Sequence, residues 1–246
     1  MNKEKILNFN VSTITQQNLL NKIFSDYINN IKNFIVNINP EIIINNYKNK
    51  IFIENLNKQN YQIPDGIGIV WASKKLNGNI KNRITGIDLM QKICEKSINY
   101  KAKIFLYGSN VDIAEKAKIE LEKKYPGILI VGTCNGFVDE QTAIKKINKS
   151  QADILFVGLG APKQENFIIN NMNNLDNIKI FMPVGGSFDV ISKTIKRAPN
   201  WIIKINLEWL YRLFKQPMRL FRQIKLFKFV YLVFLEKFRR NVNGKN

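Results

Sequence analysis

Residues 154–165 read Ile-Leu-Phe-Val-Gly-Leu-Gly-Ala-Pro-Lys-Gln-Glu, and this stretch decides the fold class. Four apolar residues typical of a strand lead into a turn with Gly158 and Gly160, and Pro162 then suits the first turn of a helix. The N–H groups and the dipole of a helix that begins there favour an anion, and Lys163 adds positive charge. The spacing matches neither the Walker loop nor the dinucleotide fingerprint, whose third glycine is missing. The stretch therefore predicts a strand, a ligand-binding turn and a helix.

The same alternation of strand-like runs and helical segments extends along the chain in both directions. The other candidate strands are residues 33–38, 50–54, 67–71, 103–107, 128–132 and 179–183. The candidate helices are residues 86–99, 111–124, 142–149 and 163–173. This alternation favours an α/β fold with a mostly parallel sheet flanked by helices. Ligands of such sheets bind at the carboxyl ends of the strands, so we expect the site among the glycine-rich turns that follow them.

The composition is that of a globular protein and excludes several kinds of chemistry. The chain has 246 residues, 45% of them hydrophobic and 23% charged, which is enough to bury a core. It has no histidine, so Ser-His-Asp and Cys-His catalysis and histidine-ligated zinc are excluded. Its two cysteines, Cys94 and Cys134, are too few for a disulfide framework and fit a reducing compartment. Residues 1–20 lack the apolar core of a secretory signal, and no run of about 18 apolar residues predicts a membrane span.

Positive charge is concentrated toward the C-terminus. Lysine and arginine total 38 against 19 aspartate and glutamate, and residues 196–246 alone hold 13 basic and 2 acidic residues. Such an excess favours anionic partners, namely nucleic acid, an acidic membrane surface or a phosphorylated substrate. Because the composition changes near Lys196–Pro199, we expect a body of residues 1–195 and a basic, helical, amphipathic appendage of residues 196–246.

The appendage combines aromatic and basic residues at helical spacing. Four large side chains lie close to one helical face of residues 200–216: Trp201, Ile205, Trp209 and Phe214. Pro217 suits the start of a further helix, and three basic residues follow at three-residue spacing: Arg219, Arg222 and Lys225. The apolar run 226–235 is too short to span a bilayer. The pattern favours a helix on an acidic membrane surface; packing on the body, packing on a second subunit of a homo-oligomer, and nucleic-acid binding are the alternatives.

A tight turn within residues 63–71 carries a candidate catalytic acid. Asp65 and Gly66 follow Pro64 there, directly ahead of an apolar run that predicts a strand. Proline restricts the backbone and glycine opens it, so the carboxylate would be held rigidly at the mouth of a strand. The alternative is an aspartate that only caps the turn.

A second turn, residues 82–88, places Arg83 shortly before a predicted helix. Its guanidinium would suit a phosphate through two parallel hydrogen bonds. Thr85 or Asp88 would cap the helix. The alternative is an ordinary helix cap beside a solvated arginine.

A third glycine turn, residues 183–189, ends in Asp189. Its carboxylate would suit a ribose hydroxyl or the edge of a base; the alternative is an acid that complements the dipole of a helix N-terminus. The chain has no Asp-x-Asp triplet, the pair with which many nucleotide-sugar transferases hold a divalent ion. Since histidine is absent as well, we expect no catalytic metal.

Together these segments resemble the WecG/TagA/CpsF family of bacterial glycosyltransferases, also called glycosyltransferase family 26. The likeness covers roughly residues 30–225. Its motifs are residues 39–41 (Asn-Pro-Glu), 64–68 (Pro-Asp-Gly-Ile-Gly), 83–88 (Arg-Ile-Thr-Gly-Ile-Asp), 158–165, 185–189 (Gly-Gly-Ser-Phe-Asp), 197–199 (Arg-Ala-Pro) and 207–213 (Leu-Glu-Trp-Leu-Tyr-Arg-Leu). Any one of these is a weak sign, whereas all of them in this order and at family-like spacing are specific.

The resemblance implies a Rossmann-like α/β body and an inverting, metal-independent transfer that needs no cofactor. The donor would be a UDP-linked N-acetylhexosamine of the N-acetylmannosamine type, and the acceptor an N-acetylglucosamine on a polyprenyl diphosphate. Such enzymes build teichoic acid linkage units, enterobacterial common antigen or capsule. The family's appendage is implicated in docking at the membrane and in completing the active site, so we expect a cytoplasmic protein that is peripheral on the inner face of the bacterial cell membrane.

The resemblance also implies roles for single residues. Asp65 matches the general base that takes the proton from the acceptor hydroxyl. Arg83 and Gln164 match positions that line the same pocket, and Asn39 matches a polar position of the family motif. Cations must compensate the charge of the departing diphosphate. The appendage would supply three of them: Arg212, Arg219 and Arg222.

On the nucleotide side, the resemblance implies Asp189 and the turn Gly158–Gly160. Gly66 and Lys163 are further candidate substrate-binding residues. Asn37 stands where family members commonly have threonine. Asparagine still donates and accepts hydrogen bonds, so the pocket is kept. The difference leaves the identity of the donor sugar open.

Two other classes of function are alternatives. One is an oxidoreductase that binds a nicotinamide or flavin on a Rossmann-like sheet, and the missing glycine fingerprint counts against it. The other is a non-enzymatic protein that binds a membrane surface or nucleic acid. The acids and glycines at the strand ends count against this second class, and nucleic acid is the least favoured partner.

Overall fold

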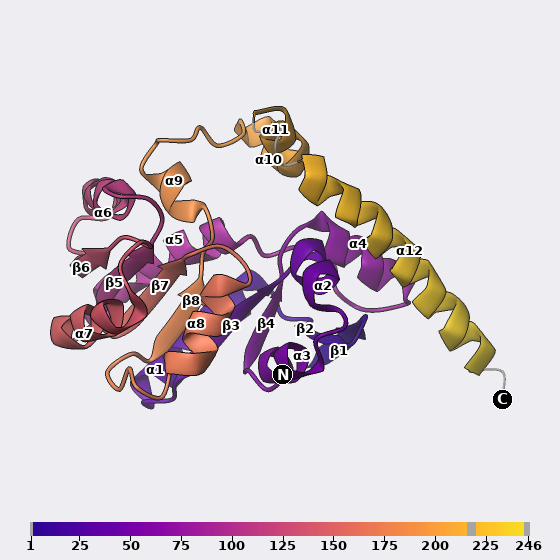
Figure 1. Ribbon diagram of the computed structural model, residues 1–246, viewed down its shortest axis with the longest axis horizontal. Coiled ribbons are helices and arrows are strands. Elements are labelled where there is room, and N and C mark those ends of the chain that lie inside the picture. Colours follow the sequence, from indigo (N-terminus) through magenta and orange to yellow (C-terminus); the bar gives the residue numbers. More distant parts are fainter. Residues whose placement is uncertain (1, 216–219, 244–246) are drawn as a thin grey trace.

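The computed structural model describes residues 2–215 and 220–243; for residues 212, 220–224 and 243 it describes the backbone alone. Its centre is a six-stranded sheet with the strand order β4-β3-β8-β7-β5-β6 (Figure 1). The strands are β3 (Asn33–Ile38), β4 (Tyr61–Pro64), β5 (Lys103–Gly108), β6 (Leu129–Cys134), β7 (Ile154–Gly158) and β8 (Ile180–Pro183). Every neighbouring pair in this sheet is parallel, which confirms the Rossmann-like α/β fold.

The first and last strands of the sheet, β3 and β8, are neighbours. The chain passes from β3 outward to β4 at one edge, then crosses to β5, β6 and β7, and β8 finally fills the gap between β7 and β3. The chain after β3 enters a helix on one face of the sheet, residues 40–46, and the chain after β8 enters a helix on the other face, residues 187–191. Loops that lead to opposite faces leave a crevice at the carboxyl ends of the two strands. In this chain the crevice lies between the loops that follow β3 and β8, where residues of both loops line one cavity.

Helices cover both faces of the sheet and create two hydrophobic cores. One core joins the sheet to α1 (Gln16–Ile28), α5 (Gly86–Ser97) with its 3-10 extension (Ile98–Tyr100), and α6 (Ile113–Lys124). The other joins it to α2 (Pro40–Asn46), α3 (Lys50–Asn57), α4 (Ile67–Lys75), α7 (Glu140–Ser150), α8 (Lys163–Asn171) and an antiparallel hairpin of β1 (Lys3–Ile6) and β2 (Phe9–Ser12). All of β3 is buried, with Phe34, Val36 and Ile38 in the second core and Ile35 in the first. Burial on both faces explains why the parallel strands read as continuous apolar runs.

Two of the predicted strands are wrong. Residues 50–54 belong to α3, because the Asn49 side chain accepts a hydrogen bond from the Phe52 N–H and caps a helix there. Residues 67–71 belong to α4. A short run rich in isoleucine and valine is ambiguous between a buried strand and a buried helix, and in both places the chain forms a helix.

The strand β4, which the sequence pattern missed, has only four residues. It ends at Pro64 and leads directly into Asp65, so the turn follows a strand and precedes a helix, the reverse of the predicted order. Asp65 nevertheless lies at the carboxyl end of a strand, where ligands of parallel sheets bind. The other predicted strands and the four predicted helices are confirmed, with ends shifted by a few residues.

The described residues after the sheet form the helices α9 (Ser187–Ile191), α10 (Asn200–Lys204), α11 (Glu208–Lys215) and α12 (Leu220–Asn243). The continuous helical face expected in residues 200–216 is interrupted between α10 and α11. Asn206 adopts a left-handed φ of 63° there, a conformation that asparagine tolerates and that ends a helix. The helix start predicted at Pro217 lies outside the described residues.

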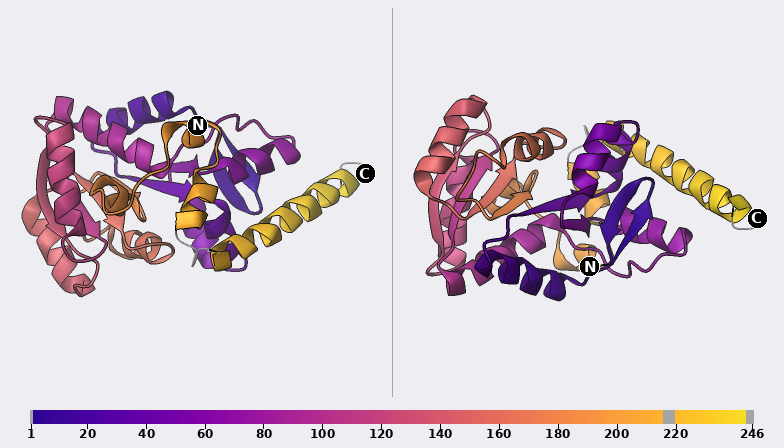
Figure 2. Two further views of the ribbon diagram at one scale, coloured as in Figure 1. Left: turned by 90° about the horizontal axis from the view of Figure 1, so that it is seen from above. Right: turned by 90° about the horizontal axis from the view of Figure 1, so that it is seen from below.

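Helix α12 packs along α2 and α4 with one face (Figure 1). Phe229 and Val233 are buried in the core, and the ring centroid of Phe229 lies 6.4 Å from that of Trp71 in α4. The C-terminal end of α12 projects beyond the rest of the protein in both further views (Figure 2). Packing on the body, one of the alternatives, therefore occurs. Within residues 2–215 and 220–243, no helix combines the length and the apolar character that a bilayer span requires.

Candidate active site

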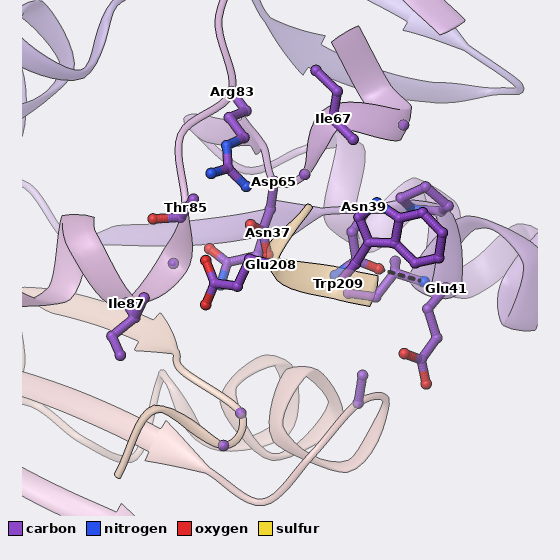
Figure 3. A pocket seen from close by; sticks show the side chains of 18 of the residues that line it. Asn37, Asn39, Glu41, Asp65, Ile67, Arg83, Thr85, Ile87, Glu208 and Trp209 are labelled. Atoms are coloured by element: carbon purple, nitrogen blue, oxygen red, sulfur yellow. Dashed lines mark hydrogen bonds between the residues drawn. The ribbon is translucent and has the colours of Figure 1, made fainter. Parts of the chain in front are cut away.

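A cavity of about 700 Å³ opens at the carboxyl ends of the strands (Figure 3). Its walls come from the loops that follow β3, β4, β7 and β8, from the start of α5, and from α11 and α12. The predicted site residues that line it are Asn37, Asn39, Asp65, Gly66, Arg83, Gly160 and Gln164. The cavity thus gathers residues from separate loops, as expected for the ligand site of an open α/β sheet.

Asp65 is held in place by its backbone. Its N–H donates a hydrogen bond to the Ile38 carbonyl, 2.8 Å away, which joins the end of β4 to the end of β3. Gly66 follows with a φ of +93°, a conformation that favours glycine. In Figure 3 the Asp65 side chain lies between Arg83 and Glu208. The carboxylate therefore has a fixed place in the wall of the cavity.

The two asparagines at the end of β3 have structural partners. Asn37 Nδ2 donates to the Pro183 carbonyl at 2.9 Å and ties β3 to β8, while its Oδ1 is buried without a hydrogen-bond partner among the described residues. Asn39 Oδ1 accepts a hydrogen bond from the Ile42 N–H at 2.9 Å and caps α2. Asn39 therefore shapes the wall as a helix cap, whereas Asn37 retains one unused acceptor.

Arg83 contacts the appendage. Its Nη2 donates a hydrogen bond to the Ile203 carbonyl of α10 at 2.9 Å. The side chain is half-buried and lines the cavity, and in Figure 3 its guanidinium points toward Asp65. The alternative of a solvated arginine is wrong, because this guanidinium lies where body, appendage and cavity meet.

Gln164 joins the turns that follow β7 and β8. Its Oε1 accepts a hydrogen bond from the Gly185 N–H at 3.0 Å, and its Nε2 donates to Glu165 Oε1 at 2.9 Å. Glu165 also lines the cavity and is completely buried, and this burial raises the pKa of its carboxyl to about 6. Sequence reasoning assigned Glu165 no role, because a glutamate in the first turn of a helix is usually exposed.

Three predicted binding residues lie outside the cavity wall. Gly158 serves packing, since a Cβ atom there would come within 2.8 Å of the Phe188 ring. Lys163 is exposed. The Asp189 carboxylate accepts a hydrogen bond from Ser109 Oγ, which lies 3.3 Å from each of its oxygens. The structure therefore does not gather these residues with the candidate catalytic acid.

The appendage contributes wall residues for which no role was predicted. Six of them line the cavity: Glu208, Trp209, Lys225, Leu226, Phe229 and Val230. Glu208 is only 6% exposed, whereas Trp209 is 40% exposed. Glu208 and Trp209 belong to the motif of residues 207–213. The motif does not indicate that these residues pack against the loops at the carboxyl ends of the strands.

The three predicted appendage cations have no described side-chain positions. Arg219 lies outside the described residues. Arg212 and Arg222 lie in α11 and α12, and only their backbone is described. Their part in the site stays a prediction.

The charge of the cavity wall is mixed. Among the described residues, the lining acids are Glu41, Asp65, Glu165 and Glu208, and the lining bases are Arg83 and Lys225. The N-termini of α4, α5 and α8 lie at the same wall, and the helix dipoles add partial positive charge there. In the described part of the chain, no three acidic or cysteine side chains form a group suited to a metal ion. An anionic ligand would depend on the helix N-termini and a few cations.

The fold and the cavity together define a class of protein: an α/β enzyme whose ligand site lies at the carboxyl ends of parallel strands. The model of the Glycosyl transferase WecG/TagA/CpsF family matches residues 4–243, and the chain belongs to this family. A relative from Bacillus subtilis (strain 168), named N-acetylglucosaminyldiphosphoundecaprenol N-acetyl-beta-D-mannosaminyltransferase, is 37% identical over 204 residues, which cover 82% of this chain and 79% of the relative. A Staphylococcus aureus (strain MW2) protein of the same name is 32% identical over 235 residues, which cover 94% and 92% of the two chains.

The family and its relatives identify the chain as a glycosyltransferase. The oxidoreductase and the non-enzymatic binding protein, the two alternatives, are therefore set aside.

Proposed function

We propose that the protein is an inverting glycosyltransferase of cell-surface polysaccharide or teichoic acid synthesis. It moves an N-acetylmannosamine-type sugar from a UDP donor to an N-acetylglucosamine linked to a polyprenyl diphosphate. The names of its relatives support the sugar and the acceptor. The observation that carries the mechanism is the position of Asp65, fixed at the end of β4 in the wall of the cavity.

Asp65 acts as the general base. A hydroxyl of the acceptor attacks the anomeric carbon on the face opposite UDP, the new bond from that carbon to the acceptor oxygen forms, and the bond to the diphosphate breaks. The hydroxyl proton passes to the Asp65 carboxylate, and UDP leaves with the bonding electrons. One carboxylate is sufficient for a single displacement with inversion. The hydrogen bond to Ile38 and the turn at Gly66 keep this carboxylate oriented.

The departing diphosphate is neutralised by the protein alone, without a metal ion or an organic cofactor. Arg83 and the N-termini of α4, α5 and α8 supply positive charge in the cavity wall. Because the described wall holds more acids than bases, additional cations are needed during transfer. Arg212, Arg219 and Arg222 of the appendage supply them.

The appendage, residues 196–246, also docks the enzyme on the inner face of the cell membrane. One face of α12 is buried on the body, while aromatic residues of the opposite face are exposed: Phe227, Tyr231 and Phe238. Exposed aromatic residues with flanking lysine and arginine suit an anionic lipid surface, where each basic residue contributes about 1 kcal/mol. Leu226, Phe229 and Val230 of the same helix line the cavity, so docking would bring a lipid-linked acceptor close to it.

A transfer assay tests the proposal. The purified chain is incubated with UDP-N-acetylmannosamine, or with a panel of other UDP-sugars, and a lipid-diphosphate N-acetylglucosamine acceptor, with and without EDTA. Mass spectrometry should find one added N-acetylhexosamine, in equal amounts under both conditions. Absence of product with every UDP-sugar, or its loss in EDTA, would contradict the proposal.

A further inference from the structure

Arg197, from the Arg-Ala-Pro motif, bridges the body and the appendage. Its Nη1 lies 2.6 Å from Asp88 Oδ1, and its Nε lies 3.5 Å from Glu208 Oε1. Asp88 is in the first turn of α5, and Glu208 is in the first turn of α11. One guanidinium therefore joins two helices that are far apart in the sequence.

The bridge is shielded from water at its Glu208 end, whereas the Asp88 side chain is 39% exposed. The side chains of Arg197 and Glu208 are 23% and 8% exposed, so their attraction is screened less than that of a surface pair. Burial alone would raise the pKa of Asp88, but hydrogen bonds from Arg197 and Thr85 outweigh it and lower the pKa below its ordinary value. Asp88 and Arg197 are thus both charged at neutral pH.

A second arginine holds the same part of the appendage. Arg83 Nη2 donates to the Ile203 carbonyl, so among the described side chains both Arg83 and Arg197 attach α10 and α11, residues 200–215, to the body. Apolar burial in this segment is only partial, with Ile202, Leu210 and Leu213 half-buried. No residue of α10 is buried, and Trp201, Ile205 and Phe214 are 65%, 53% and 79% exposed. Because so much of its apolar surface stays exposed, the polar contacts of the two arginines contribute to holding this segment on the body.

We infer that Arg197 is a positioning residue: by holding Glu208 against α5, it keeps residues 200–215 across the cavity. Arg197 itself does not line the cavity, whereas Glu208 and the neighbouring Trp209 do. The guanidinium therefore acts through the residues that it places. The catalytic consequence rests on the proposed sugar transfer, but the contact itself does not.

Amide hydrogen exchange of Arg197→Gln tests the inference independently of activity. Loss of the bridge should raise exchange of residues 200–215 about tenfold and leave the sheet unchanged, because one charge-assisted contact is removed from a weakly buried segment. The kcat/KM for sugar transfer should fall by a similar factor. Arg197→Lys, which keeps the charge but not the fork of donors, should give an intermediate result for both.

The matched control is Lys196→Gln, which removes one positive charge from the neighbouring, exposed residue. It should change neither exchange nor transfer. Unchanged exchange of residues 200–215 in Arg197→Gln would overturn the inference, and so would faster exchange throughout the body, which would mean a general structural role. If Arg197→Gln does not fold, Glu208→Gln should show the same local rise. Failure of the wild-type chain to transfer any sugar would refute the proposed function and leave the exchange result standing.

Discussion

The N–H of Asp65 lies 2.8 Å from the carbonyl oxygen of Ile38, and this hydrogen bond joins the ends of β4 and β3. The backbone of Asp65 is thus held by two neighbouring strands. A change confined to the side chain should therefore leave the geometry of the cavity intact. This separation between backbone support and side-chain chemistry makes Asp65 directly testable.

Asp65→Asn should abolish proton acceptance without disturbing the fold. We expect kcat to fall about 10²- to 10⁴-fold, the usual contribution of a general base, with an unchanged Tm. Steady-state kinetics and thermal unfolding measure the two effects. Asp176→Asn is the matched control, because the Asp176 side chain is 90% exposed and should tolerate the same change. Transfer at the wild-type rate by Asp65→Asn would remove the catalytic assignment.

Gly66→Ala tests whether the turn beside Asp65 is needed for chemistry. A Cβ at Gly66 would meet no atom within 4 Å, so the cost comes only from the φ of +93°. We expect a loss of about 1–2 kcal/mol in the free energy of unfolding, and a lower kcat as the turn shifts to relieve the strain.

Gly127→Ala is the control for the Gly66 variant. Gly127 has a φ of +89° and only an ordinary contact, 3.6 Å from Ile98 Cγ2, and it is not part of the cavity wall. Urea unfolding should show a similar loss of stability, while kcat stays unchanged. Equal losses of kcat in the two variants would mean that the effect of Gly66→Ala comes from instability alone.

The fold was largely predictable because its central strands are buried on both faces. Phe34, Ile35 and Val36 form one apolar run, and short runs of this kind indicate parallel strands that are buried on both faces. The same composition led to the wrong prediction of a strand at residues 50–54, where Asn49 caps a helix. The Asn49 side chain can cap α3 only when the backbone around it is already folded. The apolar composition of residues 50–54 alone therefore could not distinguish a helix from a strand.

The candidate site was predictable only where its residues follow strands. Asp65 and Gln164 lie at strand ends, and the sheet brings such positions together. Glu208 reaches the same cavity from an appendage that two arginines attach, Arg83 and Arg197. These contacts join residues separated by many positions in the sequence, and no local pattern encodes them. The burial of Glu165 likewise depends on packing that forms only in the folded protein.

Glu165 should make stability depend on pH. Burial raises its pKa from the ordinary 4.5 to about 6, so the folded state binds the proton more tightly than the unfolded state. The stabilising effect of the protonated Glu165 carboxyl is fully present below pH 4.5 and is lost as the pH rises through about 6. Relative to Glu165→Gln, the wild-type free energy of unfolding should fall by about 2 kcal/mol across this window and then level off.

Urea unfolding of both proteins from pH 4.5 to 8 measures the difference. Glu95→Gln is the control, because the Glu95 side chain is 53% exposed in a surface ion pair and no such slope is expected across this window. A constant difference between wild type and Glu165→Gln would show that Glu165 keeps an ordinary pKa in the folded protein.

The exposed face of α12 should determine membrane binding, and point variants test this better than truncation. Deleting residues 196–246 would also remove Phe229 and Val233 from the core and destabilise the body. The double variant Phe227→Ser/Phe238→Ser instead removes two rings that are 78% and 69% exposed. Because these rings make little contact with the body, Tm should stay within a few degrees of wild type.

Sedimentation with anionic vesicles should show the partition coefficient of Phe227→Ser/Phe238→Ser lowered about tenfold or more, since each ring loses apolar burial in the interface. Phe137→Ser is the matched control, because Phe137 is 73% exposed but lies in the loop between β6 and α7 rather than on α12. Its partition should equal that of wild type. Equal losses of vesicle binding in both variants would mean that exposed aromatic residues contribute wherever they lie on the surface. An unchanged partition coefficient of Phe227→Ser/Phe238→Ser would contradict docking through this face of α12.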